Sequence, residues 1–160
     1  MSQPTSEERL TRKFRDLNKS NFKVTSPQDG EYNCIAWAFG RDDLVWWPVP
    51  TLSDGNPLGG YYWPYGVSLD DSLEAFIEAF RQFGYEPCES DDLEPGYEKI
   101  AIYVGANRMP THAARQLENG NWSSKLGPSH DIEHSSLAVL TGKDYGLVGQ
   151  IMRRSRTNQI

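Results

Sequence analysis

One cysteine and one histidine, distant in the chain, have the residue types and settings that covalent catalysis needs. Cys34 stands at the head of the apolar run 35–39, directly after polar turn residues. This pattern predicts a buried helix with the cysteine in its first turn, where unpaired backbone N–H groups and the helix dipole favour a thiolate. The alternative is that Cys34 is a small buried hydrophobic residue, as free cysteines often are.

His112 is the histidine best placed to serve such a nucleophile, because it begins a predicted strand. A base must take the thiol proton and later protonate the leaving group. We predict that Asp131 orients the imidazole, since an ionised carboxylate also stabilises the imidazolium cation. A Cys-His pair without a third residue is one alternative, and a hydrogen-bonded structural histidine is another. Gln28, Asn33 and the backbone N–H of Cys34 are the candidate oxyanion donors.

A predicted hairpin positions the histidine. Asn119 and Gly120 separate two strand-like segments, 110–117 and 122–126, and Asn-Gly is the strongest short hairpin signal. A two-residue turn predicts that Gln116 faces Ser123 across the strands. The period of two then places five side chains on one face: His112, Ala114, Gln116, Ser123 and Lys125.

The remaining elements follow from hydrophobic periodicity. Residues 1–20 predict an amphipathic surface helix, 68–83 a helix with one apolar face, and 99–152 an antiparallel sheet that starts with an apolar strand. Arg153 begins a basic tail that we expect to be frayed. Cys88 lies among acidic residues, which disfavour a thiolate, so it is a poor nucleophile candidate. We therefore predict one α+β domain over residues 1–160, with N-terminal helices packed on a C-terminal antiparallel sheet.

Residues 40–67 predict an aromatic loop, because tryptophans and tyrosines alternate there with prolines and glycines. The loop could pack over the core, with its rings supplying burial. It could also line a cleft in which the rings stack on a ligand. The predicted substrate-binding residues are Trp46, Trp47, Trp63 and Gln116.

Composition limits the classes of function. The 160 residues include 22 acidic and 16 basic side chains, giving a net charge of −6 and no long basic block, which argues against nucleic acid as a partner. Two cysteines are too few for a disulfide scaffold. The N-terminal residues lack the apolar core of a signal peptide, and no apolar run is long enough to span a membrane. The sequence therefore predicts a cytoplasmic protein without a membrane partner.

These residues resemble the papain-like cysteine hydrolases, which include peptidoglycan-cleaving members. The stretch 34–39 resembles their Cys-Trp-Ala-Phe segment, and Gln28 occupies the position of the papain oxyanion glutamine. His112 with Ala113, followed by Trp122 and Lys125, resembles their histidine strand and the Trp-x-x-Lys strand after it. Leu126 stands where that superfamily has its asparagine, so the third catalytic residue departs from the pattern.

What the resemblance implies is a papain-like fold and a cysteine hydrolase or acyltransferase that cleaves an amide bond without a cofactor. A peptide-like or peptidoglycan-like substrate is expected. The segments 32–38 (YNCIAWA) and 110–117 (PTHAARQL) also resemble those of an uncharacterised bacterial family, over most of the chain. That second resemblance implies no activity.

Two other classes of function compete with the hydrolase. His130, Asp131, Glu133 and His134 could bind a metal ion, since His-x-x-x-His is a zinc spacing on a helix. Pro128 lies just upstream and no cysteine pair is present, so we predict no metal. The other class is a non-catalytic binding module, effector-like or immunity-like, that recognises a partner protein through the aromatic loop and leaves Cys34 buried.

Overall fold

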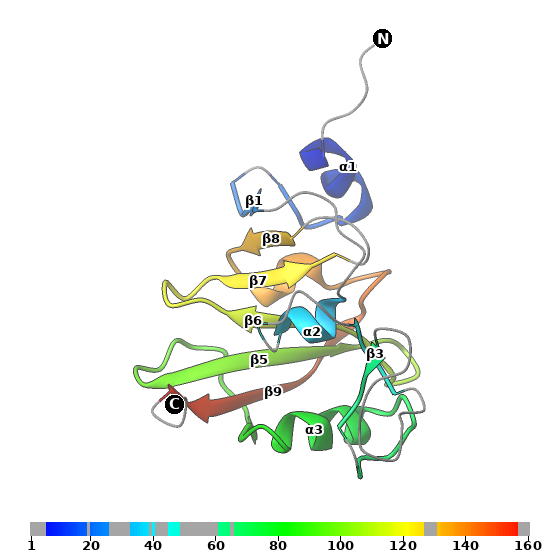
Figure 1. Ribbon diagram of the computed structural model, residues 1–160. Helices are drawn as coiled ribbons and strands as arrows, with labels where there is room; N and C mark the ends of the chain where they lie inside the picture. Colours follow the sequence, from blue (N-terminus) through cyan, green and yellow to red (C-terminus); the bar gives the residue numbers. More distant parts are fainter. Residues whose placement is uncertain are drawn as a thin grey trace.

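The computed structural model of the protein describes residues 6–18, 20–25, 33–38, 40, 45–48, 61–64, 66–126 and 131–156 (Figure 1). Its helices are short. They are α1 (Ser6–Lys13), α2 (Cys34–Ala38), α3 (Leu73–Arg81) and the 3-10 helix η1 (Leu137–Leu140). No helix in these ranges is both long and apolar enough to cross a membrane.

An antiparallel sheet, whose strands do not follow their order in the sequence, dominates the molecule. Its seven strands are β1 (Phe22–Val24), β4 (Glu86–Cys88), β5 (Tyr97–Val104), β6 (Pro110–Gln116), β7 (Trp122–Lys125), β8 (Asp131–His134) and β9 (Leu147–Ser155). They lie in the order β1-β8-β7-β6-β5-β9-β4. The short strands β2 (Val45–Trp46) and β3 (Tyr61–Tyr62) form a separate parallel pair.

Both faces of the sheet are covered, because its central strands carry apolar side chains on both sides. On one face, Ile100 and Ile102 of β5 pack in the core that includes residues of α2 and α3. On the other, Ala101 and Tyr103 join a second core that includes residues of η1 and of the N-terminal segment around α1. Figure 1 shows α2 in front of β6 and β7, and α1 beyond the β1 edge. We call these the α2 face and the η1 face.

The predicted papain-like arrangement, with N-terminal helices packed on a C-terminal sheet, is wrong. The fold is sheet-rich with short helices, and β1, from the N-terminal part of the chain, forms one edge of the sheet while β4 forms the other. The predicted sheet range 99–152 also misses the ends of β5 and β9. A short strand such as β4 has too few residues to show a periodic pattern, which is why the sequence did not reveal it.

The hairpin is present, but its register differs by one residue from the prediction. Gln116 pairs with Trp122 and Ala114 with Ser124. The turn is longer than two residues, because Leu117 N–H bonds Asn121 O and Gly120 N–H bonds Leu117 O, with Gly120 at φ 90°. A type I turn followed by a left-handed glycine has this form. A one-residue slip moves each side chain of the partner strand to the other face, so Ser124, not Ser123 or Lys125, shares the face of His112.

Candidate functional site

Cys34 begins α2, as the sequence predicted, and is partly buried. Burial raises the pKa of its thiol to about 11, because a desolvated thiolate is unfavourable. The backbone N–H groups of Ala113, Ile35 and Cys34 itself and the charge of Lys125 act in the opposite direction, but more weakly. The resting thiol is therefore protonated at neutral pH, although hydrogen-bond donors surround the sulfur.

His112 is fully buried and belongs to a hydrogen-bonded chain across three strands. Its Nε2 lies 2.9 Å from Ser124 Oγ, which lies 2.8 Å from His134 Nε2. His134 Nδ1 lies 2.9 Å from the carbonyl oxygen of Ser136. A carbonyl only accepts, so His134 carries its proton on Nδ1 and its Nε2 accepts from the Ser124 hydroxyl. Ser124 Oγ then accepts from His112, whose proton must be on Nε2.

This tautomer leaves the Nδ1 of His112 as a bare acceptor. Nδ1 is buried and has no hydrogen-bond partner in the part of the chain that the structure describes. The ring stacks on Tyr145 with centroids 4.1 Å apart and planes 7° from parallel, and Tyr103 meets it edge-on. Burial first, and then the charge of His134, lower the pKa of His112 well below its ordinary value. The imidazole is neutral, held in one orientation, and has one unused lone pair.

The structure brings Cys34 and His112 to the same end of β6 without a hydrogen bond between them among the described residues. The thiol lies beside the N–H of Ala113, the residue after His112. Cys34 also interacts electrostatically with Tyr145, whose ring covers His112. The register nevertheless directs His112 to the η1 face, with its strand partner Tyr103, while α2 packs on the opposite face. The two residues approach β6 from opposite sides.

Asp131 lies away from His112. It pairs across the strands with Lys125, on the α2 face, and both residues are buried. The partner of His112 is instead Ser124, on the η1 face. Ser124 was not predicted, because a two-residue turn would place its side chain on the opposite face from His112.

Of the two oxyanion candidates, Gln28 lies outside the described residues. Asn33 caps α2, because its Oδ1 accepts from Ala36 N–H at 3.0 Å. The same oxygen accepts from Trp46 N–H at 3.0 Å, and Nδ2 donates to Trp46 O at 2.7 Å. The Asn33 amide therefore joins α2 to β2, and these contacts are structural.

The predicted substrate-binding aromatic residues lie in or against the core. Trp46 is 3% exposed and Trp63 1% exposed, and both belong to the core on the α2 face. Trp47 is partly buried and packs edge-on against Phe76, with ring centroids 5.3 Å apart. A ligand could reach only the exposed part of Trp47. The structure thus gives these rings the packing role that the sequence left as one of two alternatives.

The residues weighed as metal ligands are dispersed. His130 lies outside the described residues, and both nitrogens of His134 are used by Ser124 and Ser136. Glu133 accepts hydrogen bonds from Asn119 and Asn121. Within the described ranges, no three side chains of histidine, cysteine, aspartate or glutamate come together in a way that could hold a metal ion.

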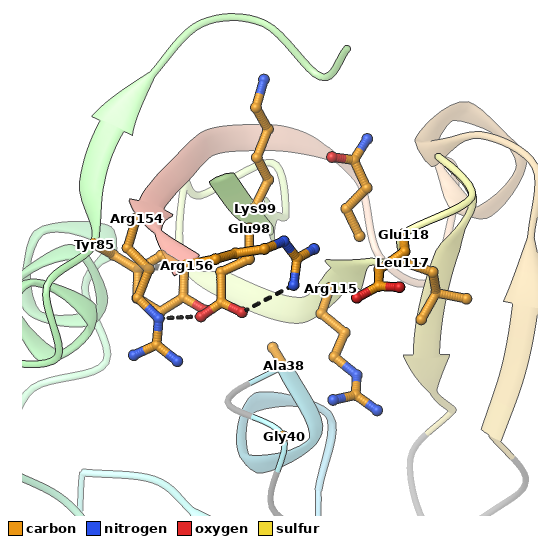
Figure 2. A pocket seen from close by; sticks show the side chains of 11 residues that line it. Ala38, Gly40, Tyr85, Glu98, Lys99, Arg115, Leu117, Glu118, Arg154 and Arg156 are labelled. Carbon is orange, nitrogen blue, oxygen red and sulfur yellow. Dashed lines mark hydrogen bonds and ion pairs between the residues drawn. The ribbon is translucent and has the colours of Figure 1, made fainter. Parts of the chain in front are cut away.

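A separate cavity of about 330 Å³ opens at the C-terminal end of α2 (Figure 2). This volume is in the range of small-molecule sites. Its lining is rich in charge, with four cationic and two anionic side chains. The lining residues are Ala38, Gly40, Tyr85, Glu98, Lys99, Arg115, Gln116, Leu117, Glu118, Arg154 and Arg156. Gln116, a predicted substrate-binding residue, is among them, and its Nε2 donates to Asp91 O.

The sequence did not reveal this cavity, because Arg153 and the residues after it were expected to form a frayed tail. Strand β9 continues to Ser155 and pairs with β5, so Arg154 lies opposite Glu98. The spacing of Arg154 and Arg156 was the available signal, since residues two apart in a strand point to the same side. Both side chains contact Glu98.

Comparison with known proteins identifies the family of the chain, but that family has no known function. A family model described as a domain of unknown function (DUF7689) matches residues 23–153. No curated protein and no solved structure matches the chain.

Proposed function

Because the chain belongs to the DUF7689 family, whose function is unknown, we propose an activity from the site itself: cysteine-dependent acyl transfer at an amide bond. Cys34 is the nucleophile and His112 is the base. The observation that carries the proposal is the hydrogen-bonding state of His112. Ser124 and His134 orient its Nε2–H, and its Nδ1 lone pair is buried and unused. A general base needs this combination of a fixed ring and an available lone pair.

The chemistry begins from a neutral pair, since the thiol pKa is about 11 and the pKa of His112 is lowered. As the Cys34 sulfur attacks the substrate carbonyl carbon, its proton moves to His112 Nδ1. The carbon–nitrogen bond breaks when the amine takes that proton, and a thioester remains. Water then attacks the thioester, giving one proton to Nδ1, and the sulfur regains its proton as the acid leaves. The backbone N–H groups near the sulfur supply donors for the developing oxyanion.

In this proposal, Ser124 and His134 orient the His112 imidazole, the role that the sequence predicted for Asp131. They act through His112 and are therefore positioning residues. Because Cys34 and His112 approach β6 from opposite sides, the proposal requires a rearrangement on substrate binding that brings the sulfur to His112 Nδ1. This movement is larger than the tightening of a long hydrogen bond in an unliganded enzyme.

The test is amide cleavage by purified protein and four variants. A set of peptide-derived aminomethylcoumarin amides and a peptidoglycan muropeptide digest serve as probes, read by fluorescence and by mass spectrometry. We expect Cys34→Ser and His112→Gln to abolish cleavage, Ser124→Ala to lower kcat by about 10-fold to 100-fold with a small change in KM, and Cys88→Ser to retain activity.

The folding midpoint of each variant, from thermal denaturation, separates loss of chemistry from loss of fold. Cleavage by Cys34→Ser at the wild-type rate would disprove the assigned nucleophile. Failure of the wild type to cleave any probe would leave the proposal without support from these two substrate classes.

A further inference from the structure

We propose that the cavity at the C-terminal end of α2 binds a small amino-carboxylate, such as a free amino acid or a peptide end, with its carboxylate on Arg115 and its ammonium on Glu118. This site is independent of the acyl-transfer proposal, because Cys34 lies at the other end of α2 and does not line the cavity. Three observations carry the inference: the unpaired state of Arg115, the unpaired state of Glu118, and the pairing of the other charged groups.

Arg115 presents a guanidinium that makes no close ion pair with a described carboxylate, although the charges of Asp131 and Glu98 act on it from a distance. It stacks on the Trp37 ring, with the guanidinium carbon 4.3 Å from the ring centroid, and its Nε is buried without a hydrogen-bond partner. The Arg115 side chain makes no hydrogen bond or ion pair with a described residue. A partly buried guanidinium keeps its charge and has five donors in a planar fork that matches a carboxylate. Stacking on Trp37 fixes the plane of that fork before a ligand arrives.

Gly40 leaves room for the guanidinium. A Cβ on Gly40 would lie 3.2 Å from Arg115 Nη1, which is tighter than an ordinary contact, and its φ of 82° disfavours other residues. Figure 2 shows the Arg115 side chain extending from β6 toward the end of α2. Gly40, just after α2, thus lies directly beside the Arg115 guanidinium.

The other cations of the cavity are already paired. Arg154 and Arg156 both contact Glu98, as the dashed lines in Figure 2 show, and Arg154 Nη1 also donates to Phe83 O. Lys99 Nζ lies 2.8 Å from Glu94 and donates to Ser90 O. Arg154 and Arg156 share the single carboxylate of Glu98, and Lys99 shares Glu94 with Arg153, so each of these cations has a carboxylate partner. Arg115 is the cation of this lining without such a partner among the described residues.

Glu118 is the matching unpaired anion. It is exposed, lies just past the end of β6, and makes no ion pair or hydrogen bond with a described residue. Glu98, by contrast, is engaged by two arginines. One unpaired cation and one unpaired anion in the same small cavity complement a ligand that carries both charges.

The experiment titrates the full chain by NMR with two matched series at constant ionic strength. The first comprises glycine, β-alanine, 4-aminobutyrate and 6-aminohexanoate. The second comprises acetate, propionate, butyrate and hexanoate, which lack the amino group. We expect at least one amino acid to bind roughly two- to fivefold more tightly than its matched carboxylate, the size that an exposed ion pair supplies. The chain length that binds best reports the spacing of the two charges.

Variants assign each charge. Arg115→Gln should weaken binding of both series at least about tenfold, and Arg115→Lys should recover only part of it, since lysine cannot form the bidentate pair. Glu118→Gln should remove the advantage of the amino acids and leave carboxylate binding unchanged. Arg81→Gln and Glu89→Gln, exposed residues that do not line the cavity, are the charge-matched controls.

Equal binding of the two series to the wild type would overturn the amino-carboxylate assignment, as would tighter binding of inorganic phosphate in a parallel titration. Binding by Arg115→Gln at the wild-type affinity, or no binding by the wild type, would overturn the site itself. None of these results depends on whether Cys34 is catalytic, so failure here and failure of the acyl-transfer proposal are separate outcomes.

Discussion

At the scale of single residues, the environment of Cys34 decides what kind of nucleophile it is. The start of α2 surrounds the sulfur with N–H donors, which the sequence indicated. Desolvation outweighs them, and burial depends on which strands pack over the helix, which a single sequence does not show. The predicted thiolate is therefore replaced by a protonated thiol with a pKa of about 11. Any chemistry at Cys34 must remove that proton during the reaction.

This thiol pKa predicts slow alkylation at neutral pH. We expect iodoacetamide to modify Cys34 in the native protein at least about tenfold more slowly at pH 7.5 than in a short peptide with the same flanking sequence, because little thiolate is present. The rate should rise with pH toward about 11. Mass spectrometry of timed samples resolves Cys34 from Cys88. Fast alkylation that is constant between pH 6 and 8 would contradict the raised pKa and indicate a preformed thiolate.

At the scale of elements, the sequence predicted the presence of the main helices and of the hairpin more reliably than their boundaries. The helix at Cys34, the helix ending before Gly84, and the hairpin at Asn119 and Gly120 are present. The α3 cap is Ser72, whose Oγ accepts from Ala75 N–H, so the helix begins at Leu73 and not at residue 68 as predicted. The Asp70 carboxylate accepts hydrogen bonds from the backbone N–H and the hydroxyl of Ser72, which stabilises the turn before α3.

The hairpin shows how a small error at a turn changes a site. Asn-Gly is compatible with turns of different length, and the sequence does not say which one forms. The longer turn moved Ser124 beside His112 and placed Lys125 with Asp131 on the α2 face. The identity of the residue that orients His112 therefore depended on one residue of register.

The chain of His112, Ser124 and His134 joins β6, β7 and β8, and it predicts that acid destabilises the fold. Burial lowers the pKa of His134 from 6.5 to about 4, and that of His112 is lowered too. The unfolded chain binds more protons than the folded one below about pH 6.5, so stability is lost as the pH falls from 6.5 toward 4. Between pH 7.5 and 5.0, the titration of His134 alone should lower the free energy of unfolding by about 2 kcal/mol.

Urea denaturation of the wild type and of His134→Gln at these two pH values measures this effect. We expect the free energy of unfolding to fall less in the variant by about 2 kcal/mol, whatever its stability at pH 7.5. An identical fall in both proteins would show that His134 is not the titrating group.

At the scale of the whole molecule, one sheet supports two cores. The alternation along β5 gives Ile100 and Ile102 to the α2 face, and Ala101 and Tyr103 to the η1 face. The sequence showed that this strand is apolar, as a strand with both faces covered is. It did not show which segments cover each face, because that depends on contacts between residues far apart in the chain. The papain-like arrangement failed at this level.

Because the same strands carry both cores, the domain should unfold as one unit. Phe76 on the α2 face is fully buried, and Trp122 on the η1 face is 2% exposed. Phe76→Ala and Trp122→Ala should each cost about 3–5 kcal/mol of stability, because each leaves a cavity that the sheet cannot close. Leu147→Ala is the control, since Leu147 is 69% exposed and should change stability by less than about 0.5 kcal/mol.

Far-ultraviolet circular dichroism and tryptophan fluorescence, followed in the same urea titration, test the coupling of the two faces. We expect the two signals to change together in the wild type and in both core variants, at a lower midpoint in the variants, as a two-state transition requires. Separation of the two curves in Trp122→Ala alone would mean that the η1 face unfolds while the α2 face stays folded. The chain from His112 to His134 would then be lost before α2 moves, because it lies on the face that opens first.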